Sequence, residues 1–341
     1  MGDARKERNL VMRVMALCIL ASVVTFTALA AENPIQGNWR GRFVGGGWES
    51  RTLTAQVIAT SNVNYRVQFF VGNEEADPVK LVITGQRPND EAVTAEFSGQ
   101  VRVDGVLYEV TATAENEDMT GQFAGDGATI PFEMRKIYII PPTLGAEPPE
   151  GAIVLFDGTN AEENWQRHPL VWNMVGGGAM EVSRSNLVTK YEHGSGRLHV
   201  EFLCPLMANS TGQGRANSGV YVHGRYEVQV LDSFGDDPAD NLCGGIYRIA
   251  APIQMASLPP EEWQTYDIDF TAPKFDDSGQ KVENARITVV HNGVLIHDDV
   301  ELPNCTAGGV SDQEVAEGVL MLQDHGDRVR FRNIWFLPSE D

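Results

Sequence analysis

Apolar and polar residues alternate along most of the chain beyond Pro34, which is the pattern of half-buried β-strands. No stretch with a helical period is longer than about three turns. Six alternating runs, separated by Gly, Asn, Asp or Pro, occupy residues 52–60, 65–72, 79–85, 92–101, 106–115 and 119–125. This spacing predicts a small antiparallel β domain over residues 32–140, built as a sheet, a barrel or a sandwich.

The alternation stops at residues 141–152, which contain four prolines in the sequence PPTLGAEPPEGA. Proline removes a ladder donor and fixes the backbone, so this segment is predicted to be a linker between domains. Alternating runs resume over residues 153–338. So many strands are too extensive for one flat sheet, and two facing sheets are the natural way to bury them.

Strand parity shows which polar residues face away from an apolar core. In the run YEVQVLDS, Val228 and Val230 share one face, so Glu227 and Gln229 point the opposite way. The same reasoning selects polar residues on two other strands, namely His199, Glu201, Gln323 and His325. For any single pair, a solvent-facing sheet surface is the simpler explanation.

Asn and Gln are poor β-formers. Their presence in strands therefore indicates that something other than strand propensity placed them there, such as binding of a ligand. Gln229, Gln323 and Asn217 all lie in strand contexts. Five aromatic residues are close to them in sequence: Tyr221, Tyr226, Tyr247, Trp263 and Tyr266. Aromatic faces beside amides and carboxylates can hold a sugar, which offers both C–H patches and hydroxyls. Filling of the core is the alternative for at least half of these aromatic residues.

Composition narrows the class of protein. The 341 residues include 47 Asp and Glu against 26 Lys and Arg, for a formal net charge of -21. Such a chain repels polyanions, which argues against a nucleic acid or an anionic membrane as partner. Hydrophobic residues make up 42% and there are 34 Gly, as expected of a folded, turn-rich chain of about two domains.

Residues 1–30 have the features of a signal peptide. Basic residues precede a run of about 16 apolar residues, which ends in the small-residue pattern Ala28, Leu29, Ala30. A membrane span needs about 20 residues, so we expect cleavage after Ala30, no remaining membrane anchor, and a periplasmic or secreted protein. Three cysteines then remain, Cys204, Cys243 and Cys305, which allow one disulfide and leave at least one thiol unpaired.

Motifs for metals and cofactors are weak. The acidic stretch 232–241 could suit calcium, but Pro238 interrupts it and the EF-hand spacing is missing, so a solvated loop is expected. The glycine-rich segments do not match nucleotide-binding patterns, and the nucleophile elbow GxSxG is absent. We therefore expect no metal and no other cofactor.

Seven segments of the second half together resemble the bacterial 3-keto-disaccharide hydrolase domain family. They are LFDGTN at 155–160, the tryptophans at 165 and 172, NSGVYVHGRYEVQVLDS at 217–233, GGIYRIAAP at 244–252, WQTYDIDFTAPKFD at 263–276, HNGVLIHD at 291–298 and LQDHGDRVRFRNIWFLP at 322–338. The resemblance covers about residues 151–338 and leaves residues 32–137 without an assigned chemistry. It implies an all-β, concanavalin-like or laminin-G-like sandwich with a jelly-roll topology.

The resemblance also implies a substrate, a small glycoside whose C3 hydroxyl has been oxidised to a ketone. Such a ketone acidifies the hydrogen on C2, so a base can remove it and the enolate can expel the aglycone from C1, after which water adds to the enone. The reaction needs a base near C2, a donor for the enolate oxygen and an acid for the departing oxygen. It needs neither nicotinamide nor the paired carboxylates of ordinary glycosidases.

Roles follow from parity and from this chemistry. His325 and Glu227 are the expected acid and base, in either order, and Glu201 and Asp232 are the alternative carboxylates. Seven residues are expected to contact the sugar: Gln229, Asn217, Gln323, Tyr221, Tyr247, Trp263 and Arg332. Of these, Arg332 is expected to support the enolate. A non-catalytic carbohydrate-binding module would share this groove without needing His325. A cell-envelope interaction protein would instead place the selected residues on separate surfaces.

Overall fold

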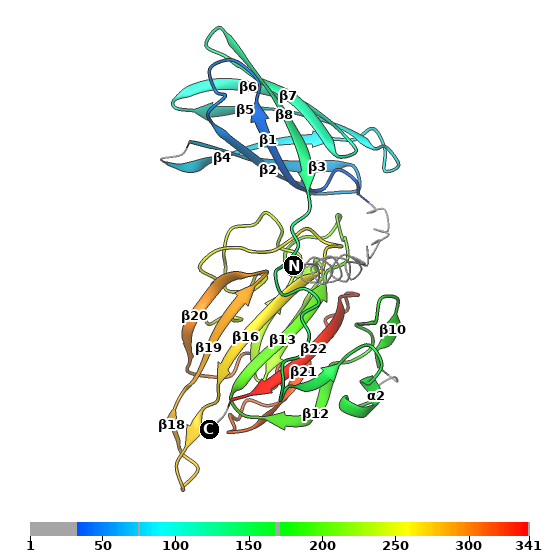
Figure 1. The fold of residues 1–341 in the computed structure, drawn as a ribbon, viewed down its shortest axis with the longest axis vertical. Coiled ribbons are helices and arrows are strands. Elements are labelled where there is room, and N and C mark those ends of the chain that lie inside the picture. The colour runs from blue at the N-terminus through cyan, green and yellow to red at the C-terminus, as the bar shows by residue number, and fades with distance from the viewer. Residues whose placement is uncertain (1–32, 74–75, 168–170, 340–341) are drawn as a thin grey trace, which may run out of the picture. The chain divides into compact units, whose positions relative to one another are not determined.

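The computed structural model describes residues 33–73, 76–167 and 171–339, so the predicted signal peptide lies outside the described residues. Eight antiparallel strands of the first half close into a barrel, in which each strand pairs with the next and β8 returns to β1 (Figure 1). They are β1 (Gly37–Phe43), β2 (Thr52–Ala59), β3 (Asn64–Asn73), β4 (Ala76–Gln86), β5 (Thr94–Val103), β6 (Val106–Glu115), β7 (Asp118–Gly125) and β8 (Ala128–Ile137).

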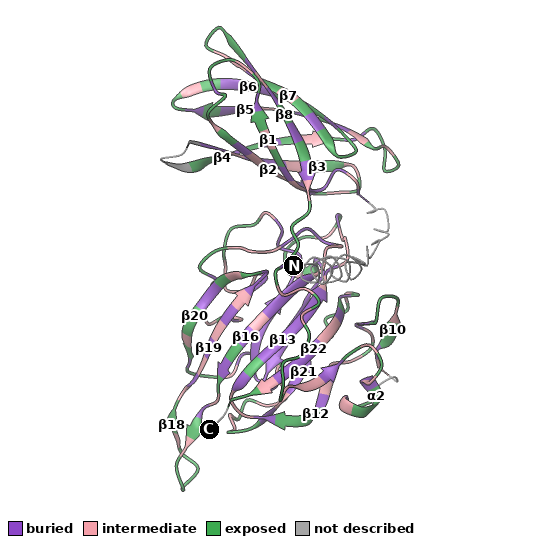
Figure 2. Ribbon diagram, viewed as in Figure 1, coloured by how far each residue is buried: buried purple, intermediate pink, exposed green. Residues whose placement is uncertain are grey.

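The barrel interior is apolar because every second residue of its strands points inward. Buried and exposed residues alternate along β5 and β6 (Figure 2). Inside, the rings of Phe69, Phe123 and Phe132 meet edge to face, with centroids 5.6–6.0 Å apart. The alternation predicted β2 to β7, but not β1, which carries two arginines and two glycines, nor β8, which contains Pro131.

The second half forms a sandwich of two sheets, together with a short hairpin. The large sheet has the order β10-β11-β22-β13-β16-β19-β20, with β9 paired to β22, and the small sheet has the order β12-β21-β14-β15. The large sheet comprises β9 (Ile153–Phe156), β10 (Asn173–Val175), β11 (Ala179–Glu181), β13 (Gly196–Leu203), β16 (Gln264–Thr271), β19 (Ala285–His291), β20 (Val294–Leu302) and β22 (Arg330–Pro338). The small sheet comprises β12 (Leu187–His193), β14 (Ser218–Val222), β15 (Tyr226–Val230) and β21 (Gly318–Leu322). The hairpin is β17 (Lys274–Phe275) with β18 (Lys281–Glu283), and the helices are α2 (Ala161–Asn164) and the 3-10 turn η1 (Gly212–Gly214).

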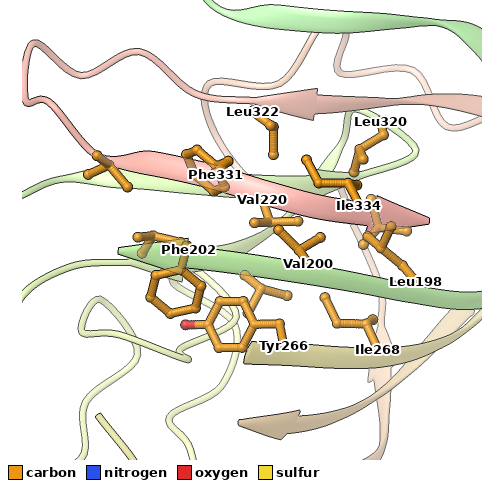
Figure 3. Packing of buried hydrophobic residues seen from close by; sticks show 14 of the residues in the cluster. Leu198, Val200, Phe202, Val220, Tyr266, Ile268, Leu320, Leu322, Phe331 and Ile334 are labelled. Atoms are coloured by element: carbon orange, nitrogen blue, oxygen red, sulfur yellow. The ribbon is translucent and has the colours of Figure 1, made fainter. Parts of the chain in front are cut away.

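One hydrophobic core lies between the two sheets. Val200, Phe202 and Ile334 of the large sheet share it with Val220 and Leu322 of the small sheet (Figure 3). Val228 and Val230 are also part of this core, which confirms the parity predicted for β15. The chain is therefore all-β, while the jelly-roll connectivity of the sandwich stays a prediction.

The segment between β8 and β9 contains the four prolines and no strand. It is not a free spacer, because it packs on the outer face of the large sheet. The Thr143 hydroxyl donates to Asp267 over 2.6 Å, and the backbone N–H of Gly145 donates to Oε1 of Glu201 over 2.5 Å. These bonds order the segment and cover part of that face.

The three cysteines beyond the signal-peptide region are all unpaired. Cys204 and Cys243 are buried in the core of the sandwich, and Cys305 is half-buried. The disulfide that the sequence allowed is therefore absent from the described residues. No helix in the described ranges is long and apolar enough to cross a membrane.

Candidate functional site

The face of the small sheet that points away from the core carries a buried carboxylate. The hairpin of β14 and β15 turns tightly at His223 and Gly224, both of which have positive φ. Its register places Tyr221 opposite Glu227. Tyr226 and Val228 point into the core, so Glu227 points outward as parity predicted, yet its residue is only 2% exposed.

Glu227 belongs to a short hydrogen-bonded chain. Its Oε2 is 2.8 Å from the Tyr221 hydroxyl, and the Gln323 side-chain amide donates to the same hydroxyl over 3.1 Å. Oε1 makes no hydrogen bond within the described part of the chain and lies directly over Gly219, where any Cβ would overlap it. One oxygen of the carboxyl is thus held in place and the other is available to a ligand.

The environment changes the acidity of this carboxyl. Burial raises the pKa of Glu227 to about 7, against the opposing effect of the hydrogen bond from Tyr221. A carboxyl with this pKa exists in both protonation states near neutral pH. It can therefore accept a proton and return it without a large energetic cost.

Three amides belong to the same sheet as Glu227: Gln229 follows it by two positions on β15, Gln323 bonds to Tyr221, and Asn217 precedes β14. Each has a buried oxygen with no partner in the described residues. Gln213 from η1 accepts hydrogen bonds from the amides of Asn217 and Gln229, over 3.4 and 3.1 Å. The side-chain oxygens of Asn217, Gln229 and Gln323 remain unsatisfied. An unpaired buried acceptor is costly, so three of them on the sheet that carries Glu227 indicate a site that is completed by a ligand with hydroxyl donors.

His325 lies in the loop that follows β21, two residues beyond Gln323. The loop is tied to the same cluster, because the backbone N–H of Asn217 donates to Asp327 over 2.7 Å. The His325 side chain is exposed and has no hydrogen bond to another described residue. This leaves the imidazole accessible in the loop that the Asn217–Asp327 hydrogen bond holds.

Parts of the site were not predicted from the sequence. Thr306 accepts the backbone N–H of Glu227, and Ala307 provides a carbonyl oxygen 2.8 Å from the Tyr221 hydroxyl. These residues come from a loop without a recognisable motif. Tyr247, which was predicted, is half-buried, and its backbone N–H donates to the carbonyl oxygen of Glu227.

Three predicted site residues lie elsewhere. Glu201 and Arg332 pair with each other over 2.7 Å on the outer face of the large sheet, and Trp263 stacks on the Arg332 guanidinium at 3.9 Å. Parity was right that Glu201 faces away from the core, but β13 belongs to the opposite sheet from β15. The core separates this group from Glu227, so the assignment of Glu201, Arg332 and Trp263 to the sugar site is corrected.

The surroundings of Glu201 indicate a structural role. Burial opposes its ionisation, but hydrogen bonds from His199, Asn333, the Gly145 N–H and Arg332 outweigh burial and lower the pKa of Glu201 to about 2. The carboxylate therefore stays charged and fully paired. It anchors the segment between β8 and β9 to the large sheet.

Asp232 is also occupied. Its Oδ2 accepts a hydrogen bond from Arg215 over 2.6 Å, and its Oδ1 accepts the N–H of Phe234. Both oxygens of this buried carboxylate are thus used within the protein, which removes Asp232 as an alternative catalytic acid. Among the aromatic residues, Tyr226 and Tyr266 are part of the core.

No group of three or more His, Cys, Asp and Glu side chains that could hold a metal ion occurs in the residues that the structure describes. The cluster itself offers a carboxyl, amides and hydroxyls. A carboxyl of pKa about 7 and an exposed imidazole can move protons, and the amides can bind hydroxyls.

Comparisons with known proteins support a carbohydrate-active enzyme. A family model described as a 3-keto-alpha-glucoside-1,2-lyase-like domain matches residues 151–337. The crystal structure of a predicted glycosyl hydrolase from Parabacteroides distasonis is 33% identical, with 56% of this chain and 85% of that chain covered and a TM-score of 0.50. A second such protein from the same organism is 22% identical, covers 55% of this chain and 99% of its own, and has a TM-score of 0.40, too low to carry an argument. A comparison with curated proteins finds no match.

Proposed function

The chain belongs to the family of 3-keto-alpha-glucoside-1,2-lyase-like domains, and from this premise we propose that its sandwich cleaves glycosides whose C3 carries a ketone. The broader statement, that this is a carbohydrate-active enzyme of the glycosidase type, rests on the family and on the Parabacteroides relative. The choice of a 3-keto substrate rests on the family, and the chemistry of the cluster around Glu227 supports it.

One observation carries the proposal: the sheet that holds a carboxyl with a pKa near 7 also carries three unpaired buried amide oxygens. The amide oxygens of Asn217, Gln229 and Gln323 are acceptors, so they call for a ligand with several hydroxyl donors, as a sugar ring has. Glu227 is the buried carboxyl of this cluster, while the carboxylate of Asp327 accepts the Asn217 N–H. A glycosidase working through an oxocarbenium ion needs two carboxyl groups flanking the bond, whereas elimination beside a ketone needs one base.

Glu227 is the proposed base. Its free Oε1 takes the proton from C2, and the C2–H electrons form the enolate of the C3 ketone. The enolate electrons then return to make the C1–C2 double bond as the C1–O bond to the aglycone breaks. The departing oxygen takes a proton, for which His325 is the proposed donor. Water then adds across the enone, so the net reaction is hydrolysis and no electrons are gained or lost overall.

Gln323 and Tyr221 position the Glu227 carboxyl. The Gln323 side chain donates to Tyr221, and the Tyr221 hydroxyl holds Oε2 of Glu227, so the base is oriented before the substrate arrives. Such pre-orientation favours proton transfer because it avoids reorganisation during the reaction.

The test is incubation of the purified protein with a 3-keto-glucoside and with its unoxidised parent, following release of the aglycone. We expect release from the 3-keto-glucoside alone. Comparable release from the parent would favour a conventional glycosidase, and binding of both sugars without release would favour a carbohydrate-binding module. A His325→Ala variant distinguishes an enzyme from a binding module, since a binding module would keep its affinity for the sugar while an enzyme would lose turnover.

A further inference from the structure

The outside of the barrel has a hollow of about 830 Å³ over β4, β5, β6 and β7. Its lining includes a grid of outward-facing residues set by strand pairing, together with residues of the barrel core such as Tyr65 and Phe97. One row across β5, β6 and β7 is Ser98, Thr111 and Gln122, and the next is Glu96, Thr113 and Thr120. Each of these residues is exposed and alternates with residues buried in the barrel core.

The grid is polar but almost uncharged. Five of its six side chains end in a hydroxyl or a primary amide, and only Glu96 ends in a carboxyl. None of the six makes a side-chain hydrogen bond or an ion pair with another residue of the described ranges. Their donors and acceptors are therefore available to a ligand. The near absence of charge in the grid contrasts with the formal net charge of -21 on the whole chain.

The spacing of these groups is regular. Neighbouring strands of a sheet are about 4.8 Å apart, and outward residues two positions apart along a strand are separated by about 6.7 Å. Hydroxyl and amide groups thus repeat in two directions over a hollow whose volume falls within the ordinary range of ligand sites, about 300–1,000 Å³.

From these features we infer that the hollow is a second binding site, which takes a neutral oligosaccharide. Hydroxyls and amides exchange donors and acceptors with sugar hydroxyls, and the size leaves room for more than one ring. An anionic glycan or a nucleic acid would meet Glu96 and no opposing cation in the grid. A protein partner would need an exposed apolar or aromatic centre, whereas the aromatic residues that also line the hollow, Tyr65 and Phe97, are buried in the barrel core.

The site would be separate from the cluster around Glu227, because every residue of the grid belongs to the barrel strands. It would hold the enzyme on a polymeric or surface-bound glycan, while the sandwich acts on small glycosides. The inference does not depend on the reaction that the sandwich catalyses.

The experiment is affinity electrophoresis of the full chain in gels that contain hydroxyethylcellulose, dextran, galactomannan or, as an anionic probe, polygalacturonate. We expect at least one neutral polysaccharide to retard the protein and polygalacturonate not to do so. The double variant Thr111→Val, Thr113→Val removes two hydroxyls and keeps β-branched side chains, so it should weaken the retardation by about tenfold.

The matched control is Thr52→Val, Thr129→Val, which changes two exposed threonines of barrel strands that do not line the hollow. This control should migrate as the wild type does, and both variants should keep the wild-type melting temperature and turnover of a small glycoside. The inference is overturned if no neutral polysaccharide retards the protein, if only polygalacturonate does, or if both double variants behave alike. Self-association of the wild type that is lost in Thr111→Val, Thr113→Val would overturn it in favour of a protein interface.

Discussion

The Tyr221 hydroxyl lies 2.8 Å from Oε2 of Glu227 and 2.8 Å from the carbonyl oxygen of Ala307. It has one proton and so donates to one of these acceptors at a time. When Glu227 is ionised, Tyr221 donates to the carboxylate. When Glu227 is protonated, the carboxyl can donate to the Tyr221 oxygen while Tyr221 donates to Ala307. Both protonation states thus keep the hydrogen bond between the two side chains, as a group that exchanges protons requires.

Replacing Glu227 by Gln should abolish the proton transfer and preserve the fold. We expect kcat/KM on a 3-keto-glucoside to fall by about 10²–10⁴-fold, the usual contribution of a general base. Folding stability should not fall at pH 8, since burial raises the pKa of Glu227 to about 7 and the ionised form therefore costs stability above that pH. Steady-state kinetics and urea unfolding check both parts, and wild-type activity in the variant would remove Glu227 from the mechanism.

The pH profile should report on Tyr221. If Glu227 acts as a base, kcat/KM rises as the pH passes about 7, where the carboxyl ionises. The hydrogen bond from Tyr221 lowers the pKa of Glu227, so Tyr221→Phe should move this rise to higher pH. The matched control is Tyr226→Phe on the same hairpin, whose hydroxyl donates to Glu314 instead. An unmoved profile in Tyr221→Phe would contradict the assignment.

Glu201 should behave in the opposite way to Glu227. It is buried and held by Arg332, and removing one partner of a buried ion pair usually costs about 3–5 kcal/mol. Glu201→Gln should therefore lower the free energy of unfolding by roughly 3 kcal/mol. Below the melting transition its kcat/KM should stay within a few-fold of wild type. A large loss of activity without a loss of stability would return Glu201 to the catalytic site.

Strand parity predicted the direction of Glu227 and Gln229 correctly, because the apolar partners Val228 and Val230 had only one core to enter. It could not predict that Glu227 would be buried. The cover comes from the loop around Thr306, which joins the site through contacts 79 residues away in sequence. No local pattern in that loop indicates such a contact.

The same argument failed for Glu201, and the reason is geometric. Parity tells which face of its own strand a residue occupies, but two sheets of a sandwich have two outer faces. Assigning β13 to the large sheet and β15 to the small sheet requires the strand order, which depends on long-range pairing. The sequence therefore identified polar residues that face outward, but it did not show which of them lie on the large sheet and which on the small sheet.

A buried histidine pair should make the fold sensitive to acid. His193 and His223 have ring centroids 5.1 Å apart. Burial lowers the pKa of His193 to about 4, and burial together with the neighbouring His193 lowers that of His223 to about 3. In the unfolded chain these groups titrate near 6.5, so the unfolded state binds more protons below that pH and stability is lost as the pH falls.

The expected loss between pH 7 and pH 5 is about 2 kcal/mol per histidine. Urea unfolding at the two pH values measures it. His193→Phe should reduce the difference, while His325→Gln, which changes an exposed side chain, should not. Equal stability of the wild type at both pH values would show that the pair is not held neutral in the fold.

The most direct test of elimination at the Glu227 site is a primary isotope effect at C2. A 3-keto-glucoside carrying deuterium at C2 should release its aglycone several-fold more slowly than the protium compound, because the C2–H bond breaks in the proposed first step. When both compounds compete for the enzyme, the relative rates of aglycone release give the isotope effect on kcat/KM. Equal rates for the two isotopologues would contradict proton removal from C2 as the step that commits the substrate to cleavage.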